Sequence, residues 1–513
     1  MYRTIPVRYN RGGFDYALRL DGIRVFDDSV RPLRTEIARE GRYVRIKAWV
    51  PGAVNATKTV IVTYRVRRGL FDVDDHAELY WNVTGNEWEV PIREAEALVV
   101  SPAGVPLDAV RSVAYTGYAG TAGADYAEER ADNFITFRTT RPLRPREGLT
   151  VAVAWPPGAL SKAGRWREAA WFLGDNWPLG LPALALALAL LVWGSYGRDP
   201  AVNRSVKPEY APPEGLMPAE AGALVGERAH PSDVSATLVD LAVRGYLRVE
   251  QLPGTGRDPD FLFRRLRPIA GDGSIRPFES FLLKRIFGSD GSLATRELSA
   301  MRRDYDNVFP PIRDELYQTL VRDGLFPVSP ARIRAGWIGA GVAALTAAGA
   351  VFIWSSDWLG VSATTLALGL GLSGAVLAAF APLMPRRTWR GAQTLVGVRG
   401  FREFLERAEK DRLARMPGDT LHRWLPWAIA LGVAERWIFN FEGLKVDAPT
   451  WLSGGDSFSL SNYHRAVTGF SQGTEQAITT GRREAGGGGW SGGSGFSGGS
   501  SGGGMGGGGG GTF

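Results

Sequence analysis

The chain has 513 residues, enough for two or three domains, with a formal net charge of +7 and no cysteine. The absence of cysteine excludes disulfides, iron–sulfur clusters, thiolate zinc sites and cysteine nucleophiles. The mild basic excess suits nucleic-acid binding, and it equally suits a membrane protein with positively charged cytoplasmic loops.

Residues 1–158 are predicted to form an extracytoplasmic all-β sandwich. The stretches "YVRIKAWV" (43–50) and "TVIVTYRVR" (59–67) alternate apolar and polar side chains, which indicates strands with one solvated face. Seven to nine short strands separated by Gly, Pro and Asp are typical of a sandwich. Tyr80 and Trp81 point to opposite sides of one such strand, so they either fill the core and its rim or form a carbohydrate or peptide platform.

Three segments are predicted to be transmembrane helices, at 177–196, 335–354 and 359–383. The first, "WPLGLPALALALALLVWGSY", has no charged residue and carries aromatic side chains at both ends. About twenty helical residues cross a hydrocarbon core of ~30 Å. The spans contain no ionisable residue, which argues against a transporter acting alone.

The arginines and lysines beside the spans predict the orientation. They follow the first and third spans and precede the second, whereas the turn between the second and third spans has none. By the positive-inside rule, residues 197–334 and 386–513 are cytoplasmic and the N-terminal domain is outside. Lys162, Arg165 and Arg167 precede the first span and weaken this prediction. We expect a multi-pass protein of the bacterial cytoplasmic membrane.

Small residues four apart are expected to pack the last two spans together. Gly336, Ala340 and Ala344 lie on one helix, and Ala367, Gly371 and Ala375 lie on the other. Such stripes allow helices in a membrane to approach closely. We therefore predict span packing through Gly336, Ala340 and Gly371.

Residues 205–334 are predicted to form a cytoplasmic α/β winged-helix-like module. From Asp233 a helix ends in "RGY", and a strand, a polar loop and a returning strand follow. Winged helices usually read DNA, but Asp233 and Asp240 on the helix before the wing would repel phosphates. The basic residues instead lie on the returning strand, where an anionic lipid surface is the expected contact of three arginines: Arg264, Arg265 and Arg267.

The rest of the cytoplasmic part is predicted to be a helical region at 386–470 followed by a disordered Gly/Ser-rich tail at 471–513. "FREFLERAEKDRL" from Phe401 has an apolar face and a charged face, and "LPWAIALGVAERW" from Leu425 has an apolar run too short to span. The tail cannot bury enough apolar surface to offset the entropy of ordering.

No catalytic constellation, cofactor motif or metal site is predicted. "GWSGG" and "GFSGG" match a hydrolase elbow only by chance, because they lie in the glycine-rich tail. None of the 4 histidines has another histidine three or four residues away, so no histidine-pair metal motif is present in the sequence.

Six stretches in one order resemble the DUF2207 family of predicted bacterial membrane proteins, the YciQ-like group: "HAELYWNVTGNEWEVPI", "YAPPEGLMPAEAG", "ATLVDLAVRGYLRVE", "GFREFLERAEKDRL", "LPWAIALGVAERW" and the glycine-rich tail. The resemblance covers nearly the whole chain and implies a membrane protein with an exported β-domain, but no activity. Family members typically carry a signal peptide before a "YR-x-I-P" segment. Here "YRTIPV" begins at residue 2, so we expect a signal to precede this sequence.

The function expected from these features is that of a non-enzymatic scaffold, sensor or assembly partner in the bacterial envelope. A membrane-tethered winged-helix transcription regulator is the alternative, and a hydrolase or transport subunit with an unseen site is the third. The expected partners are membrane lipid and a protein of unknown identity. Nucleic acid is not expected, and the oligomeric state stays open.

Overall fold

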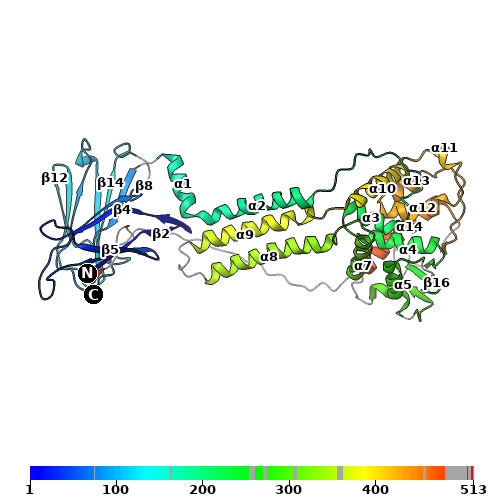
Figure 1. The fold of residues 1–513 in the computed structure, drawn as a ribbon, viewed down its shortest axis with the longest axis horizontal. Coiled ribbons are helices and arrows are strands. Elements are labelled where there is room, and N and C mark those ends of the chain that lie inside the picture. Colours follow the sequence, from blue (N-terminus) through cyan, green and yellow to red (C-terminus); the bar gives the residue numbers. More distant parts are fainter. Residues whose placement is uncertain are drawn as a thin grey trace. The chain divides into compact units, whose positions relative to one another are not determined.

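The computed structural model describes residues 1–73, 76–161, 164–252, 260–269, 274–289, 291–303, 309–354, 362–454, 458–479, 505 and 510–511. The chain divides into two compact units, which Figure 1 shows coloured along the sequence. The first unit comprises residues 1–185, 343–375 and 490–513, and the second comprises residues 186–342 and 376–489.

The first unit is rich in antiparallel strands, as predicted. Their bounds are β1 (Tyr2–Pro6), β2 (Arg8–Arg11), β3 (Phe14–Ala17), β4 (Arg19–Phe26), β5 (Arg34–Glu40), β6 (Tyr43–Trp49), β7 (Ile61–Arg67), β8 (Phe71–Val73), β9 (His76–Asn82), β10 (Glu96–Val100), β11 (Arg111–Tyr118), β12 (Tyr126–Ala131), β13 (Phe134–Thr139) and β14 (Glu147–Trp155). A short 3-10 turn, η1 (Leu107–Ala109), precedes β11.

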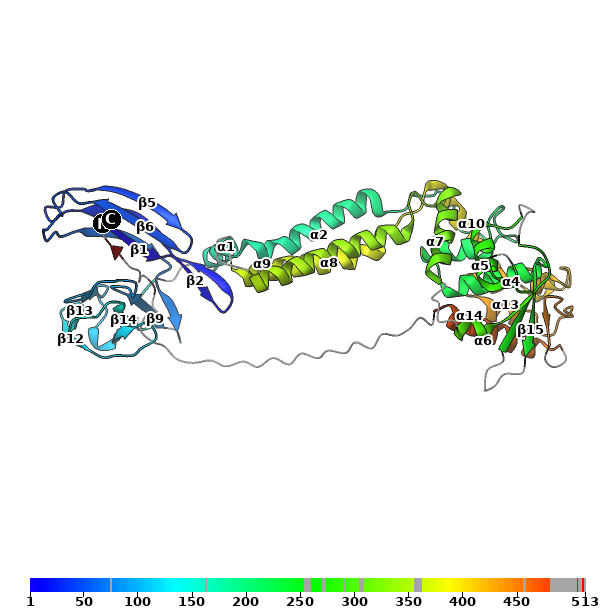
Figure 2. The same ribbon diagram turned by 90° about the horizontal axis from the view of Figure 1, so that it is seen from below.

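These strands surround two apolar cores, and Figure 2 shows them as two groups. In the first group β1, β6 and β5 pair in that order and β4 pairs with β7. In the second group the sheet β11-β14-β9-β8 and the sheet β10-β13-β12 enclose Phe137 and Leu149, both fully buried. Trp81 packs against both cores and so joins the two groups.

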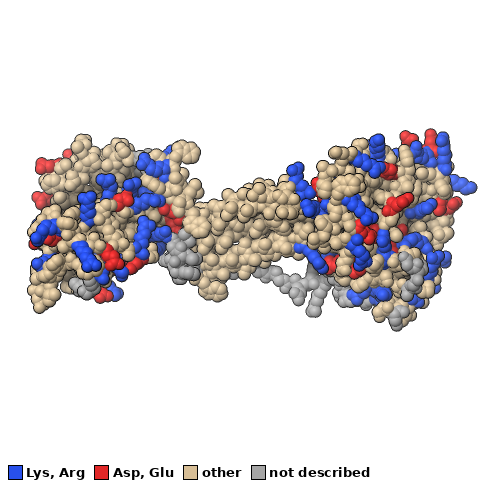
Figure 3. Space-filling view, in the orientation of Figure 1, with Lys and Arg blue, Asp and Glu red and all other residues tan. Residues whose placement is uncertain are grey.

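Among the described residues, three helices are long and apolar enough to cross a membrane, and they lie at the positions of the predicted spans: Trp177–Gly197, Pro330–Trp354 and Ala363–Leu383. The first contains η2 (Trp177–Gly180), α2 (Leu181–Val192) and the π-helical η3 (Trp193–Gly197). The second is α8 (Pro330–Trp354), and the third is α9 (Ala363–Phe380) with η5 (Ala381–Leu383). Figure 3 shows their surface without charged side chains between the flanking arginines.

Gly371 lies against the facing helix α8, whereas packing through Gly336 and Ala340 stays a prediction. A Cβ at Gly371 would lie 3.8 Å from the Cβ of Ala348 and 3.9 Å from Leu345, and nothing lies within 4 Å of a Cβ at Gly336. In an antiparallel hairpin, residues equally far from the turn face each other, which places Gly371 near Ala348.

The tightest approach of the spans is at another glycine. A Cβ at Gly369 would collide with the backbone oxygen of Pro178, at the start of the first span. Gly369 therefore lets the third span touch the backbone of the first, and a side chain at this position would separate them.

The second unit combines helices with a small sheet around one large core. Its elements are α3 (Pro218–Gly226), α4 (Pro231–Val243), β15 (Leu247–Leu252), β16 (Asp260–Arg265), α5 (Pro277–Phe287), β17 (Thr295–Glu297), α6 (Leu298–Arg303), α7 (Phe309–Arg322), α10 (Trp389–Arg407), α11 (Lys410–Leu413), α12 (Thr420–Ala430), α13 (Ala434–Phe439), β18 (Leu452–Ser453) and α14 (Leu460–Thr479).

This core takes side chains from both predicted cytoplasmic segments, 205–334 and 386–470. The sheet order is β17-β16-β15-β18, so a strand from the second segment extends the pair β15–β16 of the first. The two segments are separated by two spans in sequence but fold together as one body.

The predicted disorder from residue 471 is wrong for the residues that the structure describes. Helix α14 continues to Thr479, and its Phe470 and Ile478 are buried because apolar side chains recur at helical spacing. Near the end of the chain, Met505 is 2 % exposed in the first β core, and Gly510–Gly511, labelled β19, pairs with β1. The remainder of the tail lies outside the described residues.

Candidate ligand-binding site

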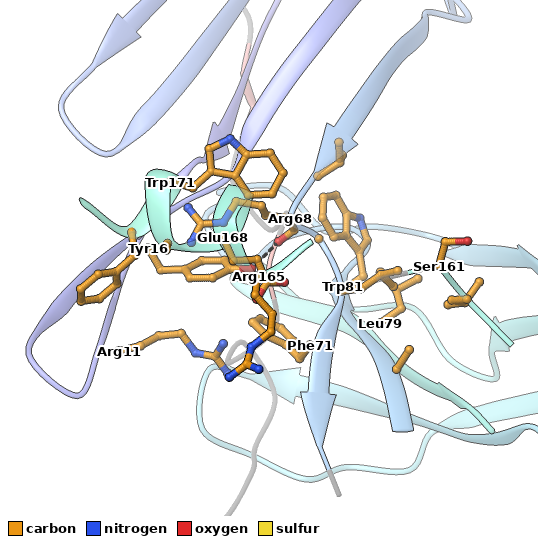
Figure 4. Close-up of a pocket in the computed structure, with 17 residues that line it drawn as sticks. Arg11, Tyr16, Arg68, Phe71, Leu79, Trp81, Ser161, Arg165, Glu168 and Trp171 are labelled. Atoms are coloured by element: carbon orange, nitrogen blue, oxygen red, sulfur yellow. Dashed lines mark hydrogen bonds between the residues drawn. The ribbon is translucent and has the colours of Figure 1, made fainter. Parts of the chain in front are cut away.

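A cavity of about 980 Å³ opens in the first unit between the β2–β3 hairpin, the segment between β7 and β8, strand β9 and helix α1 (Arg165–Asp175) (Figure 4). The aromatic side chains of its lining are Tyr16, Phe71, Trp81, Trp171 and Phe172. The volume is typical of a site for a small organic ligand, as is the mixture of apolar walls with a few charged groups.

Three arginines supply the positive charge of the cavity, Arg11, Arg68 and Arg165, and Glu168 is the single carboxylate among its described lining residues. The guanidinium carbon of Arg11 lies 3.9 Å from the ring centre of Phe71, and that of Arg68 lies 4.2 Å from the ring centre of Tyr16. Both arginines therefore rest on aromatic faces, an attractive cation–π arrangement.

Tyr16 forms a polar contact as well as part of the wall. Its hydroxyl donates a hydrogen bond of 2.9 Å to the backbone oxygen of Arg68. Burial raises the pKa of Tyr16 above its ordinary value, so the phenol stays neutral at physiological pH.

Arg68 also links the cavity to the end of α1. Its guanidinium forms an ion pair with Asp175, and the two side chains are only 9 % and 7 % exposed. The same carboxylate accepts a hydrogen bond of 3.2 Å from the backbone N–H of Ala17. Asp175, two residues before the first span, is thus bonded both to Arg68 in the cavity wall and to the end of the β2–β3 hairpin.

Further bonds join the β2–β3 hairpin to two spans, and we call this set the hairpin junction. The backbone N–H of Asp15 donates to Asn176 Oδ1 at 2.9 Å, and Asn176 Nδ2 donates to the backbone oxygen of Asp15 at 2.9 Å. Ser362, just before α9, donates through Oγ to the backbone oxygen of Gly13 at 2.8 Å, and its N–H donates to the Asp15 carboxylate. The hairpin is therefore bonded to the first residues of two spanning helices.

A second junction lies in the other unit, where the first and third spans end. Arg387 is 5 % exposed and pairs with Asp199 at 2.6 Å and with Glu227 at 2.5 Å. It also donates to the backbone oxygen of Leu224 at 2.9 Å. Burial raises the pKa of Glu227, although the charge of Arg387 opposes this effect. We call this set the arginine junction. In it Arg387, which follows the third span, is bonded to Asp199, which follows the first span, and to Glu227 at the end of α3.

The three arginines predicted to contact anionic lipid do not form one patch on the described surface. Arg264 donates to Glu250 at 2.7 Å, and Arg267 lies 5.2 Å over the ring of Tyr246. Arg264 and Arg265 are neighbours in β16 and therefore point to opposite faces of the sheet. Their contact with lipid stays a prediction.

The helix expected to repel DNA is buried. Nine residues of α4, from Asp233 to Ala242, are buried against helices that include α3, α12 and α14. Asp233 closes the N-terminus of α4 by accepting from the backbone N–H of His230 at 2.7 Å, and burial raises its pKa well above the ordinary value. Most of the surface of α4 is therefore covered by its own unit.

Of the aromatic residues Tyr80, Trp81 and Trp88, one lines the cavity and two make contacts elsewhere in the first unit. Trp81 lines the cavity and packs against both cores, whereas Tyr80 packs edge-to-face on Tyr115 at 6.4 Å. Trp88 donates to the backbone oxygen of Thr84 at 2.7 Å. Only Trp81 therefore contributes to the candidate site.

Sequence reasoning missed the cavity, because its lining comes from segments far apart in the chain. One signal was available in "RWREAAWFLGD", which carries arginines and aromatic side chains directly before the first span. Such a segment is typical of a helix at a membrane interface.

Two family models match the chain. The N-terminal domain of the predicted membrane protein family DUF2207 matches residues 1–155, and the C-terminal domain of the same family matches residues 206–441. No curated protein and no solved structure matches it. The two matches cover both folded units and most of the sequence, and so this chain belongs to the DUF2207 family of predicted membrane proteins.

Proposed function

We propose that the chain is a non-enzymatic receptor of the bacterial cytoplasmic membrane, in which ligand binding in the cavity is transmitted through the spans. The observation that carries this proposal is the position of Arg68, which lines the cavity and pairs with Asp175 at the start of the first span. A ligand that moves Arg68 or the β2–β3 hairpin pulls on both span ends bonded at the hairpin junction.

The proposal places residues 1–155 outside the cell and the second unit in the cytoplasm, where a protein partner receives the signal. The arginines after the first and third spans support this orientation. Three spans put the C-terminal tail on the opposite side of the membrane from β1. The proposal therefore implies that Met505 and Gly510–Gly511 do not pack on the first unit of the same chain once that chain is inserted in a membrane.

A binding role is favoured over catalysis by the chemistry of the cavity. Among the described lining residues the single carboxylate is Glu168 and there is no histidine. Acid–base pairs and nucleophile–base pairs both require a second group within hydrogen-bonding reach.

The transcription regulator is the weaker proposal, because α4 is buried. It predicts that the full chain in detergent binds duplex DNA, with an affinity that falls steeply as salt rises. We expect no selective duplex binding. We expect retention on anionic vesicles instead, reduced when Arg264, Arg265 and Arg267 are changed together to alanine. Sequence-selective binding to duplex at physiological salt would restore the regulator.

A disulfide lock tests the receptor proposal directly, because the chain has no cysteine of its own. A Cβ at Gly13 would lie 3.5 Å from the Cβ of Thr364, within the range for a disulfide. In Gly13→Cys/Thr364→Cys, oxidation should fix the hairpin to the start of α9. Hydrogen exchange in the arginine junction should then differ between the oxidised and reduced forms.

The control is Gly13→Cys alone, because Gly13 has a left-handed backbone with φ +89° and any side chain strains it. This single variant should exchange identically with and without oxidant. Equal exchange at Asp199 and Glu227 in the locked and the reduced double variant would show that the hairpin does not communicate with the spans.

A further inference from the structure

We infer that the cavity binds an anionic, phosphate-bearing amphiphile that enters from the outer face of the bilayer. Its head group lies between Arg11 and Arg165, and its apolar part lies along the aromatic wall beside α1. This inference rests on the proposed function, because it names the ligand class of the same cavity.

The head-group end is defined by two arginines without an acidic partner. Neither Arg11 nor Arg165 forms an ion pair with any residue that the structure describes, whereas Arg68 is neutralised by Asp175. In Figure 4 the guanidinium groups of Arg11 and Arg165 point toward one another. Two like charges that converge in this way favour an anion between them, and guanidinium groups bind phosphate oxygens in a bidentate manner.

The apolar end is defined by the walls. The rings of Phe71, Trp81 and Trp171 line the cavity together with Leu79 and Leu160. A free phosphate would satisfy the two cations and leave these walls in contact with water. An amphiphile satisfies both ends, because its chains cover the apolar surface while its head group meets the arginines.

The position of α1 identifies the bilayer as the source. Helix α1 has no buried residue, and its Trp166 is 90 % and its Leu173 58 % exposed. It ends at Asp175, two residues before the first span begins at Trp177. Exposed aromatic and aliphatic side chains beside arginines, this close to a span, are typical of a helix in the head-group layer. A cavity walled by such a helix is within reach of a lipid in the adjacent leaflet.

The inference can be tested with the full chain in a non-ionic detergent. The variant Ser161→Cys places a single thiol in the cavity lining, where an environment-sensitive fluorophore can be attached. The probes are dihexanoyl phosphatidylglycerol, dihexanoyl phosphatidylcholine, glycerol 3-phosphate and inorganic phosphate. We expect a saturable emission shift with phosphatidylglycerol and none with the other three in the same concentration range.

The arginines are tested by a pair of matched variants in the same labelled chain. Arg11→Gln/Arg165→Gln should weaken phosphatidylglycerol binding about thirtyfold, because each basic residue near an anionic head group contributes about a factor of five. Arg8→Gln/Arg167→Gln removes the same charge from the same two elements outside the lining and should bind like the parent.

Three results would overturn the inference. If phosphatidylcholine bound as tightly as phosphatidylglycerol, the site would recognise only the apolar chains. If glycerol 3-phosphate or inorganic phosphate bound as tightly, it would be a site for free anions. If both double variants lost the same affinity for phosphatidylglycerol, the effect would be one of net charge. Failure of the receptor proposal is separate: phosphatidylglycerol would then bind as expected, while the disulfide lock would leave the arginine junction unchanged.

Discussion

Replacing Asp175 with asparagine should destabilise the first unit strongly, because Arg68 then stays buried without a counter-charge. The two side chains are 7 % and 9 % exposed, and removal of one partner from a buried ion pair costs about 3–5 kcal/mol. For a unit of this size, in which 1 kcal/mol lowers the melting temperature by about 2–4 °C, we expect the melting temperature of its unfolding transition to fall by about 6–20 °C. Thermal unfolding of the full chain in detergent measures this shift.

The matched control is Arg19→Met, which removes the more exposed partner of the same carboxylate. Arg19 lies 3.6 Å from Asp175 and is 42 % exposed, so its loss should cost about 0–1 kcal/mol. The double variant Arg68→Met/Asp175→Leu leaves no buried unpaired charge, only the half-exposed Arg19, and should recover part of the stability that Asp175→Asn loses. A cost below 1 kcal/mol for Asp175→Asn, or an equal cost for Arg19→Met, would refute the reasoning.

Two further predictions concern the buried acid of α3 and the packing of the spans. Burial raises the pKa of Glu220 from its ordinary value of 4.5 to about 7. Between pH 4.5 and pH 7 the folded chain therefore keeps a proton that the unfolded chain has lost. The free energy of unfolding falls as the pH rises through this range. Glu220→Gln should therefore match the parent at or below pH 4.5 and exceed it by roughly 3 kcal/mol above pH 7 in thermal unfolding, and a pH-independent difference would contradict this sign. Gly369→Ala should cost about 1–3 kcal/mol because its Cβ meets the backbone of Pro178. Gly371→Ala, whose Cβ would lie 3.8 Å from Ala348, should unfold like the parent, and equal melting of the two glycine variants would reject this packing.

Local sequence patterns were sufficient for the elements that depend on periodicity. The alternation in "YVRIKAWV" predicted β6, and the uncharged run from Trp177 predicted the first span. The order helix, turn, strand and returning strand around "RGYLRVE" also appears, as α4, β15 and β16. Each of these features is fixed by neighbours in sequence, which is why a single chain reveals it.

Features that depend on tertiary packing could not be foreseen. Arg11, Arg68 and Arg165 are far apart in the chain, and only the folding of the hairpin and α1 over β9 brings them to one cavity. The burial of α4 depends on α12 and α14, which come after two spans. The residues that face Gly371 could not be predicted for a simpler reason: spacing along one helix shows a small-residue stripe but not which residues of an antiparallel helix lie opposite it.

The central claim is that the cavity and the span ends form one responsive assembly, and hydrogen exchange tests it most directly. The full chain is compared with and without dihexanoyl phosphatidylglycerol, and the amide protons of Ala17 and Ser362 are followed because they donate to Asp175 and Asp15. We expect the ligand to change the exchange rate of both amide protons in the parent but not in Arg11→Gln/Arg165→Gln. Saturable binding of the lipid with unchanged exchange at both amides would contradict it.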